Sequence, residues 1–145
     1  MRIPLIYAVN ARPGRRLGER EIDARCDALL GMVGLAPKAR QRPRDLSQVE
    51  MRKLELARAM AAAPRLLIAD EAMAGLSHAE VDDILSLLIQ LNEQGVTVIL
   101  IEHIMRAVMH FSQRLVVLVA GRKIADGDPA DVIRDPDVVR AYLGE

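Results

Sequence analysis

The sequence predicts an α/β domain with a mainly parallel sheet flanked by helices. Short β-rich runs alternate with helical periodicity between residues 66 and 111, an order typical of βαβ units with right-handed crossovers. The run Leu66-Leu67-Ile68-Ala69 is also continuously apolar, as expected of a strand covered on both faces. Strands of this kind end at the edge of the sheet where open α/β folds bind their ligands.

Each expected element has a local signal. The first helix follows from apolar residues that recur at helical spacing and stop at Gly34 and Pro37. A second helix ends before Pro64, and a terminal strand pair turns around Gly121. Asp-Pro occurs twice near the end, which predicts two short helices with proline in the first position. The expected elements are helix 18–33, helix 47–62, strand 66–70, helix 78–94, strand 96–101, helix 104–111, strands 114–120 and 122–125, and short helices after 128 and 135.

Composition limits the possible functions. The 145 residues suit one domain, and 51% of them are hydrophobic, enough for a real core. Twenty basic and twenty acidic residues cancel, which gives no electrostatic reason to expect a nucleic-acid partner, and the basic clusters at 12–20 and 38–44 are interpreted as solvated surface. A single cysteine, Cys26, cannot form a disulfide framework, which suits a reducing cytoplasm. Its side chain is expected to pack from a helix. No apolar run reaches the roughly 18 residues of a membrane span, so a membrane role requires a partner.

Two adjacent acids, Asp70 and Glu71, end the first strand. In ATPases that hydrolyse phosphate bonds, the first acid of such a pair helps to hold Mg²⁺ and the second can polarise the attacking water. The alternative is a strand that simply ends at a polar turn. The surrounding sequence favours the first interpretation.

Ser47 and Glu50 have the spacing of a capping box, in which each side chain bonds the other's backbone N–H. No ligand is needed to explain this pattern. A helix start is nevertheless an anion site, because free N–H groups and the helix dipole favour phosphate. Ser77 and Glu80 form a second predicted capping box, at the start of the helix from 78 to 94.

His103 follows Glu102 at the end of the second β-rich run. A lone histidine at a strand end can be purely structural. We favour a functional role for His103 on the family resemblance described below, which implies that its neutral imidazole bonds a γ-phosphate and helps to place a water molecule. His78 and His110 are expected to have no functional role.

The order of these parts resembles the second half of an ABC-type ATPase: a signature segment before a helix, a strand with paired acids, a short loop and a histidine after the next strand. The resemblance implies that Asp70 orders Mg²⁺, Glu71 polarises water and His103 senses the γ-phosphate. It also implies that Ser47, Gln48, Val49 and Glu50 meet the ATP of an opposite subunit. The family's usual Leu-Ser-Gly-Gly-Gln has become Leu46-Ser47-Gln48-Val49-Glu50 here, so both glycines are replaced and an acid is added. The family's usual Pro and Asp are replaced by Ala72 and Ser77, and the second change affects a loop that normally contacts the dimer partner.

The last residues resemble the tail of ATP-binding subunits of branched-chain amino acid transporters, above all the closing Arg140-Ala141-Tyr142-Leu143-Gly144-Glu145. The resemblance divides the chain into three segments. Residues 1–63 would be a leader, a remnant of the helical subdomain and the signature helix. Residues 64–126 would be the second half of the catalytic core, and 127–145 the tail.

A complete cassette needs a glycine-rich loop, Gly-x-x-x-x-Gly-Lys-Ser/Thr, to hold phosphates, and this chain has none. By resemblance that loop, the adenine-stacking aromatic and the glutamine loop would precede Met1. We therefore expect a partial P-loop NTPase domain of marginal stability, whose sheet leaves apolar faces and edges uncovered.

The leading hypothesis from the sequence is an ATP-binding and ATP-hydrolysing subunit of an importer of branched-chain amino acids or related solutes. Its expected cofactors are ATP and Mg²⁺, its expected partners a second ATP-binding subunit and permease subunits, and its expected place the inner face of the plasma membrane. One alternative is a non-catalytic docking protein for a permease or ATPase. Another is an ABC-type ATPase of DNA repair, against which the neutral charge and the transporter-like tail both argue.

Overall fold

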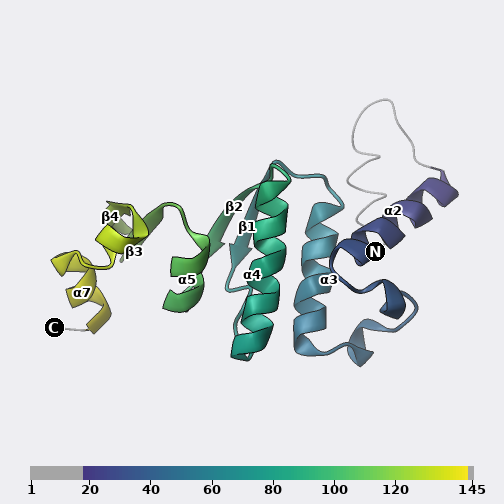
Figure 1. The fold of residues 1–145 in the computed structure, drawn as a ribbon, viewed down its shortest axis with the longest axis horizontal. Helices are drawn as coiled ribbons and strands as arrows, with labels where there is room; N and C mark the ends of the chain where they lie inside the picture. Colours follow the sequence, from purple (N-terminus) through teal and green to yellow (C-terminus); the bar gives the residue numbers. More distant parts are fainter. Residues whose placement is uncertain (1–17, 144–145) are drawn as a thin grey trace. The chain divides into compact units, whose positions relative to one another are not determined.

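The computed structural model describes residues 18–143 (Figure 1). The leader expected over residues 1–17 lies outside the described residues. The chain divides into two compact units, Met1–Ile99 and Leu100–Glu145.

The first unit contains the predicted βαβ pattern. Strands β1 and β2 are hydrogen-bonded neighbours joined through helix α4, the crossover that parallel neighbours require (Figure 1). Each predicted element of this unit is present, and its ends lie within two residues of the expected ones. The elements are α2 (Glu19–Met32), α3 (Gln48–Met60), β1 (Leu66–Asp70), α4 (His78–Glu93) and β2 (Thr97–Ile101), whose last two residues fall in the second unit. Two 3₁₀ turns that were not predicted, η1 (Ala36–Lys38) and η2 (Pro43–Asp45), lie between α2 and α3.

The core of this unit consists of apolar side chains that recur at helical spacing. Helix α4 buries one apolar stripe that recurs every three or four residues, at Val81, Ile84, Leu85, Leu88 and Leu91. Helix α2 packs on α3 through clusters that include Cys26 with Ala61, which confirms the packing role expected of the cysteine. Lys53 of α3 also donates to Asp83 of α4 at 3.0 Å.

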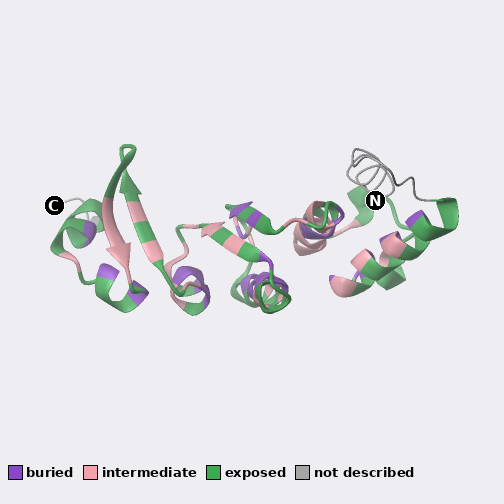
Figure 2. Cartoon of the chain, turned by 90° about the horizontal axis from the view of Figure 1, so that it is seen from above, coloured by how far each residue is buried: buried purple, intermediate pink, exposed green. Residues whose placement is uncertain are grey.

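Strand β1 is covered on one face only, so the prediction of a strand covered on both faces is wrong. Leu67 and Ala69 are buried, whereas Leu66 is 48% exposed and Ile68 57% exposed. Figure 2 shows this alternation along the strand, with α4 on one side of it. The continuous apolar run thus leaves one of its faces without cover, as expected of a partial domain.

The second unit contains α5 (Met105–Phe111), an antiparallel hairpin of β3 (Leu115–Val119) and β4 (Arg122–Gly127), and the helices α6 (Pro129–Val132) and α7 (Pro136–Leu143). Both closing helices begin with the predicted proline. The strand pairing shifts between Val117 and Leu118, which leaves Ile124 as the extra residue of a β-bulge.

Candidate functional site

The acid pair lies where the sequence predicts it, at the carboxyl end of β1. Asp70 is the last residue of the strand and Glu71 follows it, and both are exposed. The backbone of Glu71 has φ +46°, in the left-handed region that costs a non-glycine residue about 1–3 kcal/mol. Strain of this kind persists only where the surrounding structure imposes it, and it concentrates at functional sites.

The loop of residues 71–77, which carries Glu71, has a defined conformation. Met73 is fully buried and anchors it. The N–H of Ala74 donates to the carbonyl of Glu71, and the N–H of Leu76 donates to that of Met73, both at 3.2 Å. Gly75 has φ +77°, a second left-handed position. These contacts fix the backbone path of the loop that carries Glu71 beside the strand end.

Both predicted capping boxes are present. Ser47 Oγ accepts from the N–H of Glu50 at 3.4 Å, and the Glu50 carboxylate accepts from the N–H of Ser47 at 2.9 Å. At α4 the Glu80 carboxylate accepts from the N–H of Ser77 at 2.8 Å. Hydrogen bonds from Ser77 lower the pKa of Glu80. Ser47 is thus a helix cap in this structure, and its predicted contact with phosphate is a separate role.

The negative charge of Glu50 has a partner that sequence analysis missed. Lys38 of the η1 turn forms an ion pair with the Glu50 carboxylate. The hydrogen bond from Lys38, followed by that from Ser47, lowers the pKa of Glu50. The acid that replaces the family's glutamine is therefore locally compensated, which reduces the repulsion that it would exert on a nearby phosphate. No periodic signal links residue 38 to residue 50, because a loop separates them.

The start of α3 and the 71–77 loop come together through Gln48. Its side-chain nitrogen Nε2 donates to the carbonyl oxygen of Ala74 at 3.1 Å. A Cβ added at Gly75 would lie only 2.6 Å from the same nitrogen. The signature segment and the loop after the acid pair, 26 residues apart in sequence, are thus in direct contact.

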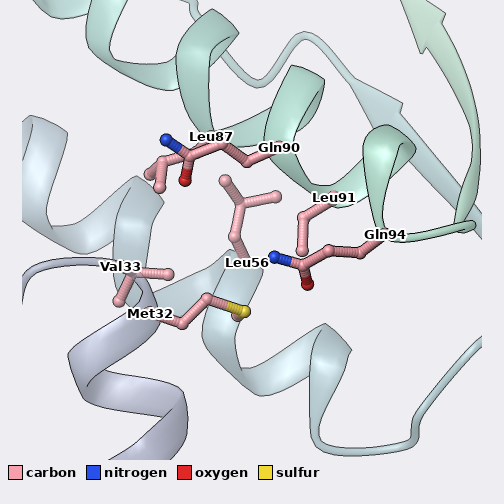
Figure 3. A pocket seen from close by; sticks show the side chains of 7 residues that line it. All are labelled: Met32, Val33, Leu56, Leu87, Gln90, Leu91 and Gln94. Carbon is pink, nitrogen blue, oxygen red and sulfur yellow. The ribbon is translucent and has the colours of Figure 1, made fainter.

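Two hollows bear on the site in the described part of the first unit. One, of about 170 Å³, adjoins Asp70 between α3 and β1, and Arg52, Glu55 and Ile68 are also among its lining residues. The other lies between α2, α3 and α4 and is lined by aliphatic side chains with two glutamines at its rim (Figure 3). Only the first combines charged groups with the end of a strand.

The predicted switch histidine belongs to the second unit. The side chain of His103 is 67% exposed, and its Nδ1 lies 4.0 Å from Oε2 of Glu102, whose side chain is buried. Its role toward a γ-phosphate stays a prediction. Residues 18–143 contain no cluster of three or more His, Cys, Asp or Glu side chains that could hold a metal ion by themselves. Every helix in this range is too short or too polar to serve as a transmembrane span.

Comparison with known proteins places these features in a family. Residues 5–74 match the family model described as ABC transporter, and residues 122–145 match the one described as branched-chain amino acid ATP-binding cassette transporter. The chain belongs to the ABC transporter family. The second match covers the predicted transporter-like tail.

Individual relatives agree with this assignment. The chain is 42% identical over 134 residues to the high-affinity branched-chain amino acid transport ATP-binding protein BraF of Pseudomonas aeruginosa. It is 37% identical, also over 134 residues, to LivG of Escherichia coli K12, a protein of the same description. Each alignment covers 92% of this chain and 52% of the relative, so the chain spans about half the length of these proteins.

Solved structures confirm the fold. A nucleotide-free ATP-binding cassette from an ABC transporter matches with a TM-score of 0.83 at 24% identity, over 99% of this chain and 63% of the other. The cbiO1 protein of Clostridium perfringens, part of an ABC transporter complex, matches with a TM-score of 0.76 at 27% identity, over 94% of this chain and 55% of the other. The architecture is thus that of a partial ABC ATPase domain.

Proposed function

We propose that the chain is the second half of an ATP-hydrolysing cassette that powers an importer of branched-chain amino acids or related solutes. The observation that carries the proposal is the acid pair at the end of β1, with Glu71 held in a left-handed conformation by an ordered loop. The matches to BraF and LivG support the solute class. A phosphate-binding loop would have to come from outside these 145 residues.

Asp70 suits a role as Mg²⁺ ligand, because Mg²⁺ in ATPases is usually held by one or two carboxylates together with substrate phosphates rather than by a protein cage. Its exposed carboxylate at the strand end meets that requirement. When bound, Mg²⁺ would neutralise charge on the phosphate oxygens. Glu71 would accept a hydrogen bond from the attacking water and orient it, and the His103 imidazole would bond the γ-phosphate.

The residues from Ser47 to Glu50 would act on a second subunit's ATP. The first turn of any helix presents N–H groups without intrahelical partners, and α3 begins at Gln48. With Glu50 paired to Lys38, the N–H of Val49 can face phosphate without a nearby uncompensated carboxylate. The proposed partners are a second ATP-binding subunit and membrane permease subunits, with the chain bound at the inner face of the membrane.

A second candidate is a non-catalytic docking protein for a permease or another ATPase. The exposed face of β1 and the lack of a Gly-x-x-x-x-Gly-Lys-Ser/Thr motif in the chain favour it. The two candidates differ in their use of Asp70, which only the ATPase needs.

The experiment compares Mg²⁺-dependent binding of a fluorescent ATP analogue by a cassette completed with the N-terminal residues of BraF. Asp70→Asn should weaken the Mg²⁺-dependent part of binding, whereas Asp27→Asn on the exposed surface of α2 should leave it unchanged. Equal Mg²⁺ dependence in the parent, Asp70→Asn and Asp27→Asn proteins would favour the docking candidate. The 145-residue chain alone is expected to bind the analogue weakly or not at all, and micromolar affinity would contradict the need for a phosphate loop.

A further inference from the structure

Gln48 makes a contact that neither helix capping nor phosphate binding explains. It is the first residue of α3, and its exposed side chain reaches a carbonyl in the 71–77 loop instead of pointing into solvent. The neighbouring Gly75 approaches so closely that a Cβ would overlap the glutamine nitrogen. With φ +77°, this position suits glycine on conformational grounds as well.

We propose that Gln48 is a positioning residue, which fastens the 71–77 loop to the start of α3 and so helps to hold Glu71 in place. The importance of Glu71 rests on the proposed function. The link itself does not, because it is a contact within the chain. The family's usual signature has glycine at this position, so the link is a property of this chain's own sequence.

The loop needs a restraint of this kind because its backbone is strained at Glu71. Glu71 occupies a left-handed conformation, and the interactions that support the loop include two backbone hydrogen bonds of 3.2 Å and the buried side chain of Met73. The bond from Gln48 adds a restraint from a distant part of the sequence, on the carbonyl of Ala74. Since Ser47 caps the same helix, the segment proposed to meet the partner's ATP and the loop that carries Glu71 are mechanically joined.

Two substitutions separate this role from a role in helix stability, because the two explanations predict different amide protection of the loop and of α3. Gln48→Glu removes the donor but places a carboxylate at the helix start, where negative charge is favourable. Gln48→Lys keeps a donor that can reach Ala74 but places a positive charge there, which is unfavourable. If Gln48 positions the loop, the amide protection of the loop should be higher in Gln48→Lys than in Gln48→Glu. If Gln48 affects only helix stability, α3 should be better protected in Gln48→Glu, and the protection of the loop should be equal in the two variants.

A double-mutant cycle tests the contact with Gly75. Gly75→Ala should lower the melting temperature in the parent chain through both the left-handed φ and the overlap with Gln48. In a Gln48→Ala background the overlap is gone, so Gly75→Ala should lower the melting temperature less. Equal decreases of the melting temperature in the two backgrounds would show that Gln48 and Gly75 do not interact.

The deciding experiment is amide hydrogen exchange of the full 145-residue chain without nucleotide, followed at residues 72–77 in the parent, Gln48→Glu and Gln48→Lys proteins. We expect loop protection to fall about three- to tenfold in Gln48→Glu, the range of one net hydrogen bond, and to be retained in Gln48→Lys. Unchanged protection in Gln48→Glu, or lower protection in Gln48→Lys than in Gln48→Glu, overturns the proposal. Because no ATP is present, this result does not depend on whether the chain takes part in hydrolysis.

Discussion

At the scale of single residues, the sequence identified some members of the candidate site and not others. Asp70 and Glu71 were identifiable from sequence as candidates, because two acids that end an apolar run have a chemical use and here occur in order with the signature segment and His103. The left-handed φ of Glu71 was not, since nothing in the residue type announces it. The Lys38 pair with Glu50 and the Gln48 bond to Ala74 were also invisible, because each joins segments whose approach depends on the fold.

The strain at Glu71 leads to a stability prediction. Glu71→Gly should raise the free energy of unfolding by up to about 2.5 kcal/mol, because a strain of about 1–3 kcal/mol is relieved at an entropy cost of about 0.5–1 kcal/mol for glycine. Denaturant unfolding measures this change. The control is Glu55→Gly within α3, where glycine should cost about 1 kcal/mol. A loss of stability in Glu71→Gly as large as that in Glu55→Gly would show that the loop is not strained.

At the scale of elements, the β3–β4 hairpin depends on an unfavourable turn residue. Ala120 and Gly121 both have positive φ, the pattern of a type I′ turn, which favours Asn-Gly. Ala120→Asn should recover part of the roughly 1–2 kcal/mol that a left-handed conformation costs an ordinary residue. Thermal melting should show a higher Tm for Ala120→Asn but not for Ala125→Asn, which changes the same residue type within β4. A Tm that falls in both variants would contradict the turn assignment.

The same hairpin carries a cluster of charges that predicts a pH dependence. Asp126 accepts from Arg114 at 2.7 and 2.9 Å and from Lys123 at 2.7 Å. These hydrogen bonds hold the pKa of Asp126 well below its ordinary value, and the bond from Arg114 contributes most. A carboxylate whose pKa is lower in the folded state stabilises the fold above its unfolded pKa of about 3.9, and that stabilisation is lost as the pH falls further.

Melting curves between pH 6 and pH 2.5 test this linkage. Asp126→Asn should be less stable than the parent at pH 6, and the difference should shrink as the pH falls below about 4. Asp131→Asn, which removes an exposed carboxylate paired with Arg134, should show a small difference at every pH. A difference for Asp126→Asn that stays constant down to pH 2.5 would exclude the proposed titration.

At the scale of the whole molecule, the sequence predicted the order and type of the elements well. Periodicity, caps and prolines are local signals, and each marked its helix or strand within a few residues. The burial of β1 was predicted wrongly, because a continuous apolar run does not say whether both faces of the strand are covered. This chain spans about half of its relatives, and Leu66 and Ile68 are exposed in it. Burial depends on the elements present, which no single segment encodes.

The proposed function depends most on Glu71, which would orient the water that attacks ATP. The most direct measurement is the steady-state ATP turnover of a cassette completed with the N-terminal residues of BraF, compared between the parent and Glu71→Gln proteins, with ATP binding measured in parallel. The amide keeps the shape of the side chain and loses the charge, so turnover should fall about 10²–10⁴-fold while ATP affinity is unchanged. Turnover that stays within a factor of two of the parent, at equal affinity, would contradict the claim.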